Sequence, residues 1–206
     1  MKKVLAFFGA FNPPTKAHVD LAKLAMEQTG HEAVIFVPSK SSYIIEEQKK
    51  EFAFSDEERL DMLHEIYRHV PWMDFCMRDL VLEEQPCTYD TLKYIRDVLH
   101  YNPTLLIGAD QFNNMEKHWK YVPKIAEEFG IVVLTRSFFS LSCESNSSLF
   151  YKGIAPYVKI IQTPAYYGNI SSTSARHALC EAKAYLKELK EKVPREVYDY
   201  LKEKYL

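Results

Sequence analysis

The 206-residue sequence lacks several features that mark common protein classes. It contains only 6 glycines, which disfavours a collagen-like, linker-like or multi-hairpin chain. The apolar run VLAFFGA near the N-terminus is far too short to span a membrane. Neither GxxxxGKS/T nor GxGxxG occurs, so the usual P-loop and dinucleotide fingerprints are missing and a redox dehydrogenase is poorly supported.

Cysteine pairs and an excess of one charge are also absent. Four cysteines are scattered without a CxxC pair, which disfavours a zinc site or a dense disulfide framework and fits a reducing cytoplasm: Cys76, Cys87, Cys143 and Cys180. The 26 basic and 28 acidic side chains leave a formal charge of -2, so an anionic partner needs a local site. We expect a cytoplasmic protein with small-molecule partners, without nucleic acid or membrane; a homo-oligomer stays open.

The composition is typical of one globular domain spanning residues 1–206. Apolar residues make up 47% and charged residues 26%, which excludes wholesale disorder, and 14% aromatic residues support a sizeable core. The basic start followed by an apolar run imitates a signal peptide. Because residues 11–14 (FNPP) interrupt that run, a first core strand explains it better.

Apolar patterning predicts alternating strands and helices. Compact apolar runs predict strands at residues 3–8, 32–37, 73–76, 104–107, 131–135 and 158–161. Helical spacing and end signals predict helices at residues 16–28, 55–70, 88–100, 121–129 and within 182–205. This alternation predicts an α/β protein with a Rossmann-like, doubly wound parallel sheet, on which helices from about residue 171 to 206 pack.

Three segments carry more detailed expectations. Residues 55–58 (SDEE) form a capping box, and the helix that follows is expected to bury Leu60, Leu63, Tyr67 and Val70. Residues 39–54 show no clean period and are predicted to be a long loop. The Ser-rich stretch 137–148 is expected to be a mobile surface excursion.

Two helix starts after predicted strands carry anion-binding signals. Ligands of open parallel sheets bind at the carboxyl ends of the strands. Thr15 and His18 are three residues apart at one helix start, where backbone N–H groups favour phosphate. Ser171–Thr173 open another helix, and Arg176 follows one turn later with a forked guanidinium suited to phosphate. The plain alternatives are two ordinary helix caps with a surface histidine and a solvated arginine.

The residues around both helix starts resemble one superfamily. GAFNPPTKAH resembles the G-x-F-D/N-P-x-H/T-x-G/A-H signature of nucleotidyltransferases related to class I aminoacyl-tRNA synthetases, and ISSTSAR is similar to their ISSTxxR. Further stretches resemble bacterial-type nicotinate-mononucleotide adenylyltransferases: FVPS at 36–39, Arg59-x-x-Met62-Leu63, TYDTL at 88–92, Gly108–Asp110 with Trp119, Arg136, and Val193-Pro194 with Tyr198. The likeness covers nearly the whole chain.

The resemblance implies adenylyl transfer from ATP to nicotinate mononucleotide, giving nicotinate adenine dinucleotide and pyrophosphate. His18, helped by Thr15, would donate to the α-phosphate, and Arg176 would hold the β- and γ-phosphates. Other residues implied to bind ATP are Gly9, Ala10, Phe11, Gly108, Asp110, Ser171, Ser172 and Thr173. Mg²⁺ would bridge the phosphates mostly through water.

The resemblance also implies a second group of residues that bind the mononucleotide: Asn12, Lys40, Thr88, Asp90, Trp119 and Arg136. Trp119 would stack on the pyridine ring, and backbone amides would read its carboxylate. The plain alternatives are a helix cap for Thr88 or Asp90, a core aromatic for Trp119 and a turn residue for Asp110.

The sequence departs from the family pattern at several positions. Thr15 replaces the more usual His, Ala17 replaces Gly, and Trp119 lies nine residues after Asp110, one more than usual. The usual Pro-Pro-His-Lys after the second strand is missing, so the phosphate-contacting lysine is open among Lys40, Lys49 and Lys50. Rival activities are use of the amide mononucleotide or of phosphopantetheine, and a rival from another class is a non-catalytic nucleotide-binding regulator.

Overall fold

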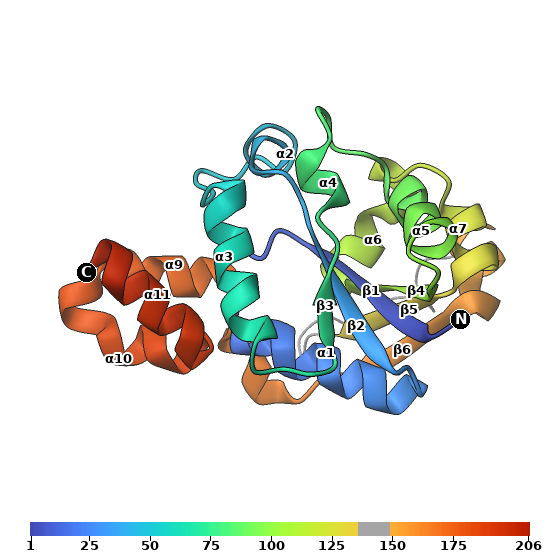
Figure 1. The fold of residues 1–206 in the computed structure, drawn as a ribbon. Helices are drawn as coiled ribbons and strands as arrows, with labels where there is room; N and C mark the ends of the chain where they lie inside the picture. Colours follow the sequence, from blue (N-terminus) through green and yellow to red (C-terminus); the bar gives the residue numbers. More distant parts are fainter. Residues whose placement is uncertain (136–148) are drawn as a thin grey trace.

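Six parallel strands form the single sheet of the described chain. The computed structural model describes residues 1–135 and 149–206, so Arg136 and the Ser-rich stretch expected at 137–148 lie outside the described residues. The strands are β1 (Lys3–Gly9), β2 (Ala33–Pro38), β3 (Met73–Phe75), β4 (Asn102–Gly108), β5 (Ile131–Thr135) and β6 (Val158–Gln162). Their order is β3-β2-β1-β4-β5-β6 (Figure 1). The chain therefore winds outward in both directions from β1 and β4, and the predicted doubly wound fold is confirmed.

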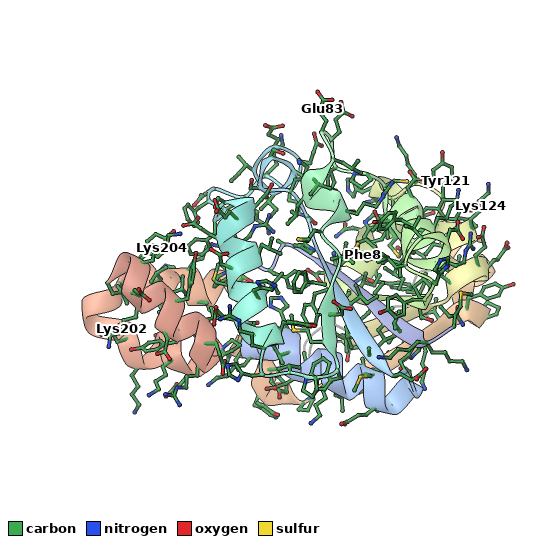
Figure 2. The ribbon with its side chains drawn as sticks, viewed as in Figure 1. Phe8, Glu83, Tyr121, Lys124, Lys202 and Lys204 are labelled. Carbon is green, nitrogen blue, oxygen red and sulfur yellow. The ribbon has the colours of Figure 1, made fainter. Side chains whose placement is uncertain are left out.

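Helices cover both faces of this sheet because its strands are apolar on both sides. Leu5 and Phe7 of β1 belong to the core on one face, which is covered by α1 (Lys16–Thr29), α3 (Asp56–Tyr67), α9 (Ser172–Cys180), α10 (Ala182–Lys192) and α11 (Arg195–Tyr205). Val4, Ala6 and Phe8 belong to the opposite core, under α5 (Thr88–Asp97), α6 (Ala109–His118), α7 (Val122–Phe129) and α8 (Leu149–Ile154). Figure 2 shows Phe8 inside the molecule and the labelled lysines at its periphery. Burial on both faces is what makes such strands continuous apolar runs.

The C-terminal helices pack beside α3, at the end of the molecule that carries the C-terminus (Figure 1). Val197 and Leu201 of α11 are fully buried, and the Tyr200 hydroxyl lies 3.3 Å from Asp61 Oδ2 of α3. The Tyr205 hydroxyl also donates to Glu58. The helices expected from about residue 171 onward are thus present, and α11 lies against α3.

Several expectations about local structure are wrong. The predicted loop 39–54 contains the short helix α2 (Ser41–Glu46), and neither α4 (Arg78–Val81) nor α6 was predicted. Pro103 lies inside β4 rather than before it. Two further short 3-10 helices follow α8 and β6, at Ala155–Tyr157 and Ala165–Asn169. None of the described helices has the length and apolarity to cross a membrane.

The buried face of α3 agrees only in part with the predicted one, since Leu63 is buried and Leu60 and Val70 are half-buried. Its capping box at Ser55 and Glu58 is confirmed. However, the buried residues are Arg59, Met62, Leu63 and Ile66, whereas Tyr67 is exposed. The fully buried guanidinium of Arg59 donates to backbone carbonyls of three other segments, so Arg59 lies on the buried side of α3 and Tyr67 on the exposed side.

Candidate active site

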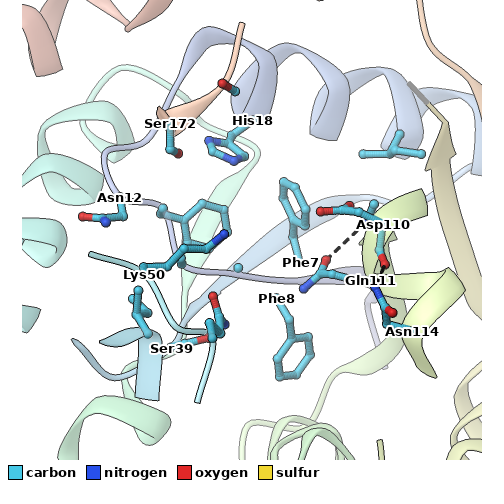
Figure 3. Close-up of a pocket in the computed structure, with 18 of the residues that line it drawn as sticks. Phe7, Phe8, Asn12, His18, Ser39, Lys50, Asp110, Gln111, Asn114 and Ser172 are labelled. Atoms are coloured by element: carbon cyan, nitrogen blue, oxygen red, sulfur yellow. Dashed lines mark hydrogen bonds between the residues drawn. The ribbon is translucent and has the colours of Figure 1, made fainter. Parts of the chain in front are cut away.

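A cavity of about 900 Å³ opens at the carboxyl ends of the strands. One wall, here called the motif side, consists of residues 9–18 after β1 and residues 171–176 at the start of α9. The opposite wall, the loop side, consists of residues 85–88 before α5 and residues 108–120 along α6. Figure 3 shows His18 and Ser172 on one side of this space and Asp110, Gln111 and Asn114 on the other, with Phe7 and Phe8 between them. The topology thus creates the cavity where the strand order reverses.

Thr15 and His18 form a capping box that orients the imidazole. The backbone N–H of Thr15 donates to Nδ1 of His18 at 3.0 Å, and the His18 N–H reaches Thr15 Oγ1 at 3.4 Å. The ring also packs edge-on against Phe11, with 5.1 Å between centroids. Because a backbone N–H can only donate, Nδ1 is the acceptor and the neutral ring carries its proton on Nε2. Thr15 is therefore a helix cap, as the plain alternative had it, and its N–H determines which tautomer of His18 is present.

Arg176 and Ser172 attach the start of α9 to the loop after β1. Arg176 Nη1 donates to the Asn12 carbonyl at 2.6 Å, and Ser172 Oγ donates to the Pro13 carbonyl at 2.8 Å. Arg176 Nη2 also reaches Thr173 Oγ1 at 3.3 Å. Burial lowers the pKa of the Arg176 guanidinium. The two predicted anion-binding helix starts therefore meet in one cavity, although more than 150 residues separate them along the chain.

The loop after β1 is shaped by a close approach and a buried charge. A Cβ atom on Gly9 would lie 3.0 Å from the Phe11 ring, and Phe11 adopts a left-handed φ of 44°. The Arg59 guanidinium donates to the carbonyls of Ala10, at 2.7 Å, and Ser39. Its positive charge is balanced by Asp56, 2.6 Å away. Arg59 thus joins the exits of β1 and β2, a role that sequence reasoning missed.

Asn12 was predicted to bind substrate, but its side chain has structural partners. Its Nδ2 donates to the Phe52 carbonyl, and its Oδ1 accepts from the Phe54 N–H, both at 2.8 Å. Only 1% of the residue surface is exposed. Both ends of the amide are therefore occupied by the loop before α3. Asn12 still lines the cavity, and its contact with substrate stays a prediction.

Polar side chains of α6 line the loop side. Asp110 lies in the first turn of α6, and its Oδ1 would lie only 2.6 Å from a Cβ atom on Gly108. The Asp110 carboxylate thus lies directly over the strand end, where any larger residue at position 108 would displace it. Trp119, the residue after the helix, lines the cavity and also packs against the core under α6. The core alternative for Trp119 is thus partly correct, while its position still permits contact with a ligand.

Of three further residues predicted to bind the mononucleotide, one lines the cavity and two do not. Thr88, the first residue of α5, lines the cavity, but Asp90 does not and instead accepts a hydrogen bond from Cys87 Sγ. Lys40 does not line the cavity either, because its ammonium donates to the carbonyls of Leu80 and Leu82. Both side chains are thus engaged with other protein groups outside the cavity lining, and their contact with substrate stays a prediction.

Lys50 is one of the three lysines that the sequence left open as the phosphate contact. It lines the cavity together with Asn12, Ser39 and His18 (Figure 3). The other basic residues in the lining are Arg176, His118 and Lys120. Its acidic residues are Glu47 and Asp110, and no cluster of three metal-binding side chains occurs among the described residues. The cavity thus suits an anionic ligand.

Among the site residues that the sequence analysis did not propose, only Arg59 carries a recognisable signal in the sequence. Arg59 occupies the same helical stripe as Met62, Leu63 and Ile66, and a charged residue within an apolar stripe indicates a buried, partnered charge. Gln85, Asn114 and Lys120 also line the cavity, but each is one polar residue among many on the chain. Their contribution depends on contacts that the sequence alone does not reveal.

Comparisons with known proteins agree with this fold. A family model described as cytidylyltransferase-like matches residues 6–178. The chain is similar to Plasmodium falciparum nicotinic acid mononucleotide adenylyltransferase complexed with NaAD, at a TM-score of 0.77 and 19% identity, over 100% of this chain and 97% of that one. With APC bound, that enzyme gives a TM-score of 0.72 at the same identity and coverage. A Vibrio parahaemolyticus protein proposed to be a nicotinate-nucleotide adenylyltransferase gives 0.58 and 19%, over 98% of this chain and 99% of that one.

Proposed function

The chain belongs to the cytidylyltransferase-like family, and we propose that it transfers the adenylyl group of ATP to nicotinate mononucleotide. The products are nicotinate adenine dinucleotide and pyrophosphate. The observation that carries this proposal is the meeting of His18 and Arg176 in one cavity at the strand ends. A site that only bound a nucleotide would not need an oriented N–H donor and a guanidinium on the same phosphate chain.

The proposed reaction is an in-line displacement at the α-phosphorus of ATP. A phosphate oxygen of the mononucleotide forms the new bond, and the bond from the α-phosphorus to the bridging oxygen of pyrophosphate breaks. The attacking phosphate is already anionic near neutral pH, so no general base is needed. Catalysis then depends on alignment of the two substrates and on stabilisation of the charge that develops on the α-phosphate.

His18 is the proposed donor to the α-phosphate. Its Nδ1 accepts from the Thr15 N–H, so the Nε2–H is the hydrogen that the ring can present to an oxyanion. Packing against Phe11 and the helix cap holds the ring in place before substrate arrives. An oriented donor of this kind stabilises the transition state without reorganisation.

Arg176 and the first residues of α9 are proposed to hold the β- and γ-phosphates. The Arg176 guanidinium lines the cavity beside the N-terminus of α9. The guanidinium and the N–H groups of the helix start both favour anions. Mg²⁺ carried on the phosphates would neutralise part of their charge, with Asp110 and Glu47 as the acidic side chains available to its water ligands. Lys50 is proposed to supply the additional cation where two anionic substrates meet.

The loop side is proposed to bind the mononucleotide. Trp119 presents an aromatic surface to the cavity, and Thr88 lies where the first turn of α5 reaches it. Backbone N–H groups at a helix start favour a carboxylate over an uncharged carboxamide. This arrangement supports the acid form of the pyridine mononucleotide as the preferred acceptor.

A paired-substrate assay of pyrophosphate release tests the proposal. Purified protein with Mg²⁺ and ATP is expected to release pyrophosphate with nicotinate mononucleotide, and to do so faster than with the amide mononucleotide. Phosphopantetheine serves as the third acceptor. Equal or reversed preference between the two mononucleotides would overturn the substrate assignment. No release with any of the three would overturn the proposed activity and favour a nucleotide-binding regulator.

A further inference from the structure

A buried carboxylate outside the cavity holds the loop side together. Asp79 of α4 is only 2% exposed, and both of its oxygens are hydrogen-bonded. Oδ1 accepts from the Thr91 hydroxyl of α5 at 2.6 Å, and Oδ2 accepts from Nε2 of Gln85 at 2.7 Å. Burial raises the pKa of Asp79, so its ionised form carries a desolvation penalty that these two donors offset.

The network around Asp79 reaches the cavity through Gln85. Gln85 lines the cavity, and its Oε1 accepts from the backbone N–H of Lys40 at 2.8 Å. The Lys40 ammonium in turn donates to the carbonyl of Leu80, at 2.9 Å, on the same short helix as Asp79. Three separate segments, the exit of β2, α4 and the loop before α5, are therefore joined through one buried carboxylate.

The second arm of the network fixes the start of α5. Thr91 is fully buried and accepts a hydrogen bond from Arg78 Nη1, at 3.1 Å, while donating to Asp79. Thr88 stands one turn before Thr91, so a displacement of Thr91 moves the helix start that lines the cavity. Neither Asp79 nor Thr91 lines the cavity itself.

We propose that Asp79 is a positioning residue for the second substrate, acting through Gln85 and Thr91 on the wall formed by residues 85–88. The proposal rests on the proposed function, because it assigns this wall to the mononucleotide. Asp79 touches no reacting atom. Its loss is expected to weaken mononucleotide use while leaving ATP use intact, because the motif side has its own attachments through Arg59 and Arg176.

The test compares three substitutions with a matched control. Asp79→Asn keeps the shape but cannot accept from both donors, and Thr91→Val removes only the hydroxyl arm. Each is expected to raise the KM for nicotinate mononucleotide about tenfold, with the KM for ATP unchanged. Thr91→Ser keeps the hydroxyl and is expected to behave as wild type. Asp74→Asn on β3, whose Oδ1 accepts from Phe75 N–H outside the cavity, controls for loss of an acidic side chain.

Hydrogen–deuterium exchange gives a readout that does not need activity. Amides of residues 82–90 are expected to exchange faster in Asp79→Asn and Thr91→Val than in wild type, Thr91→Ser or Asp74→Asn. If Asp79→Asn does not fold, Thr91→Val carries the test. Equal increases in both KM values, or unchanged exchange and KM, overturn the positioning role. Absence of dinucleotide formation by wild type instead overturns the proposed function, and the exchange experiment then still decides whether Asp79 holds this wall.

Discussion

The two sides of the cavity are held by different kinds of contact. On the motif side, Thr15 caps His18 three residues later, and Ser171 caps the start of α9 in the same way. On the loop side, Gln85 and Thr88 are placed by Asp79 and Thr91, through hydrogen bonds that join separate segments. Arg176 and Ser172 also join the two motif-side segments across the chain, but the short-range caps make that side readable as a sequence motif. Gln85 and Thr88, by contrast, are placed by tertiary contacts.

This difference implies a division of labour under the proposed function. The motif side presents an oriented imidazole and a guanidinium, which suit the phosphate chain and the developing charge. The loop side presents a tryptophan, amides and a helix start, which suit recognition of the acceptor. Substitutions on the motif side should therefore act on turnover or ATP use, and those on the loop side on mononucleotide use.

The largest expected effect comes from His18. His18→Ala is expected to lower kcat by about 10²–10³, because loss of an oriented oxyanion donor typically costs that much. His18→Asn keeps an acceptor for the Thr15 N–H but loses the donor at the Nε2 position, so it should be nearly as slow. Steady-state kinetics with both substrates measures this. His177→Ala, on the exposed side of α9, is the control, and near-normal turnover in His18→Asn would refute the donor role.

Arg176 should give the next largest effect, mainly on ATP. Arg176→Met is expected to raise the KM for ATP about tenfold or more, because a charge-assisted contact to phosphate is lost. The mononucleotide KM should change little if the two sides act separately. Arg195→Met, whose side chain is 84% exposed, serves as the control. Equal increases in both KM values would break the proposed division between the two sides.

Substitution of two lysines should give smaller effects. Lys50 tests the contribution of positive charge in the cavity, and Lys40 tests a contribution to stability. Lys50→Met is expected to lower kcat/KM by about three- to tenfold and to weaken its dependence on salt, because Lys50 lines the cavity but is exposed. Lys40→Met should leave the salt dependence unchanged and lower Tm, since its ammonium binds the carbonyls of Leu80 and Leu82. A salt response altered by Lys40→Met and not by Lys50→Met would reverse the assignment.

The sheet and most of the helices could be predicted because burial on both faces produces continuous apolar runs. The helix α6 escaped prediction because only Ala109, Phe112 and Met115 of its ten residues are buried among polar ones. The buried face of α3 was predicted only in part for a related reason. Arg59 was not expected on the buried face, because its charge is satisfied inside by carbonyls from distant loops.

In the candidate site, too, residues with local partners could be predicted and residues with distant partners could not. Thr15, His18, Ser172 and Arg176 could be proposed from spacing, since helix starts and their caps are local. The side-chain contacts of Lys40 and Asn12 could not be predicted, because their partners are backbone groups about 40 residues away along the chain. No pattern within either segment reveals that those partners are near.

The smallest expected effect is on stability at low pH, and it comes from His31. It tests whether low pH changes the stability of the fold without changing the motif side. His31 lies just beyond the end of α1, whose start holds His18. Burial, followed by the charges of Lys3 and Lys159, lowers the pKa of His31 below 6.5. The unfolded chain therefore binds the proton first, so stability declines as pH falls below 6.5 and is unaffected well above it. His31→Gln should raise Tm by about 1 °C near pH 5.5, because solvent screens a half-exposed group, and leave it unchanged near pH 8.

The same variant sharpens the comparison through its activity. The Thr15 N–H donates to Nδ1 of His18, and His31 takes no part in that contact. The pH profile of kcat should therefore be identical in wild type and His31→Gln, while only the Tm profiles differ. If His31→Gln shifts the kcat profile together with Tm, acid acts through the stability of α1 as a whole. The capping box would then no longer explain why the motif side responds differently from the loop side.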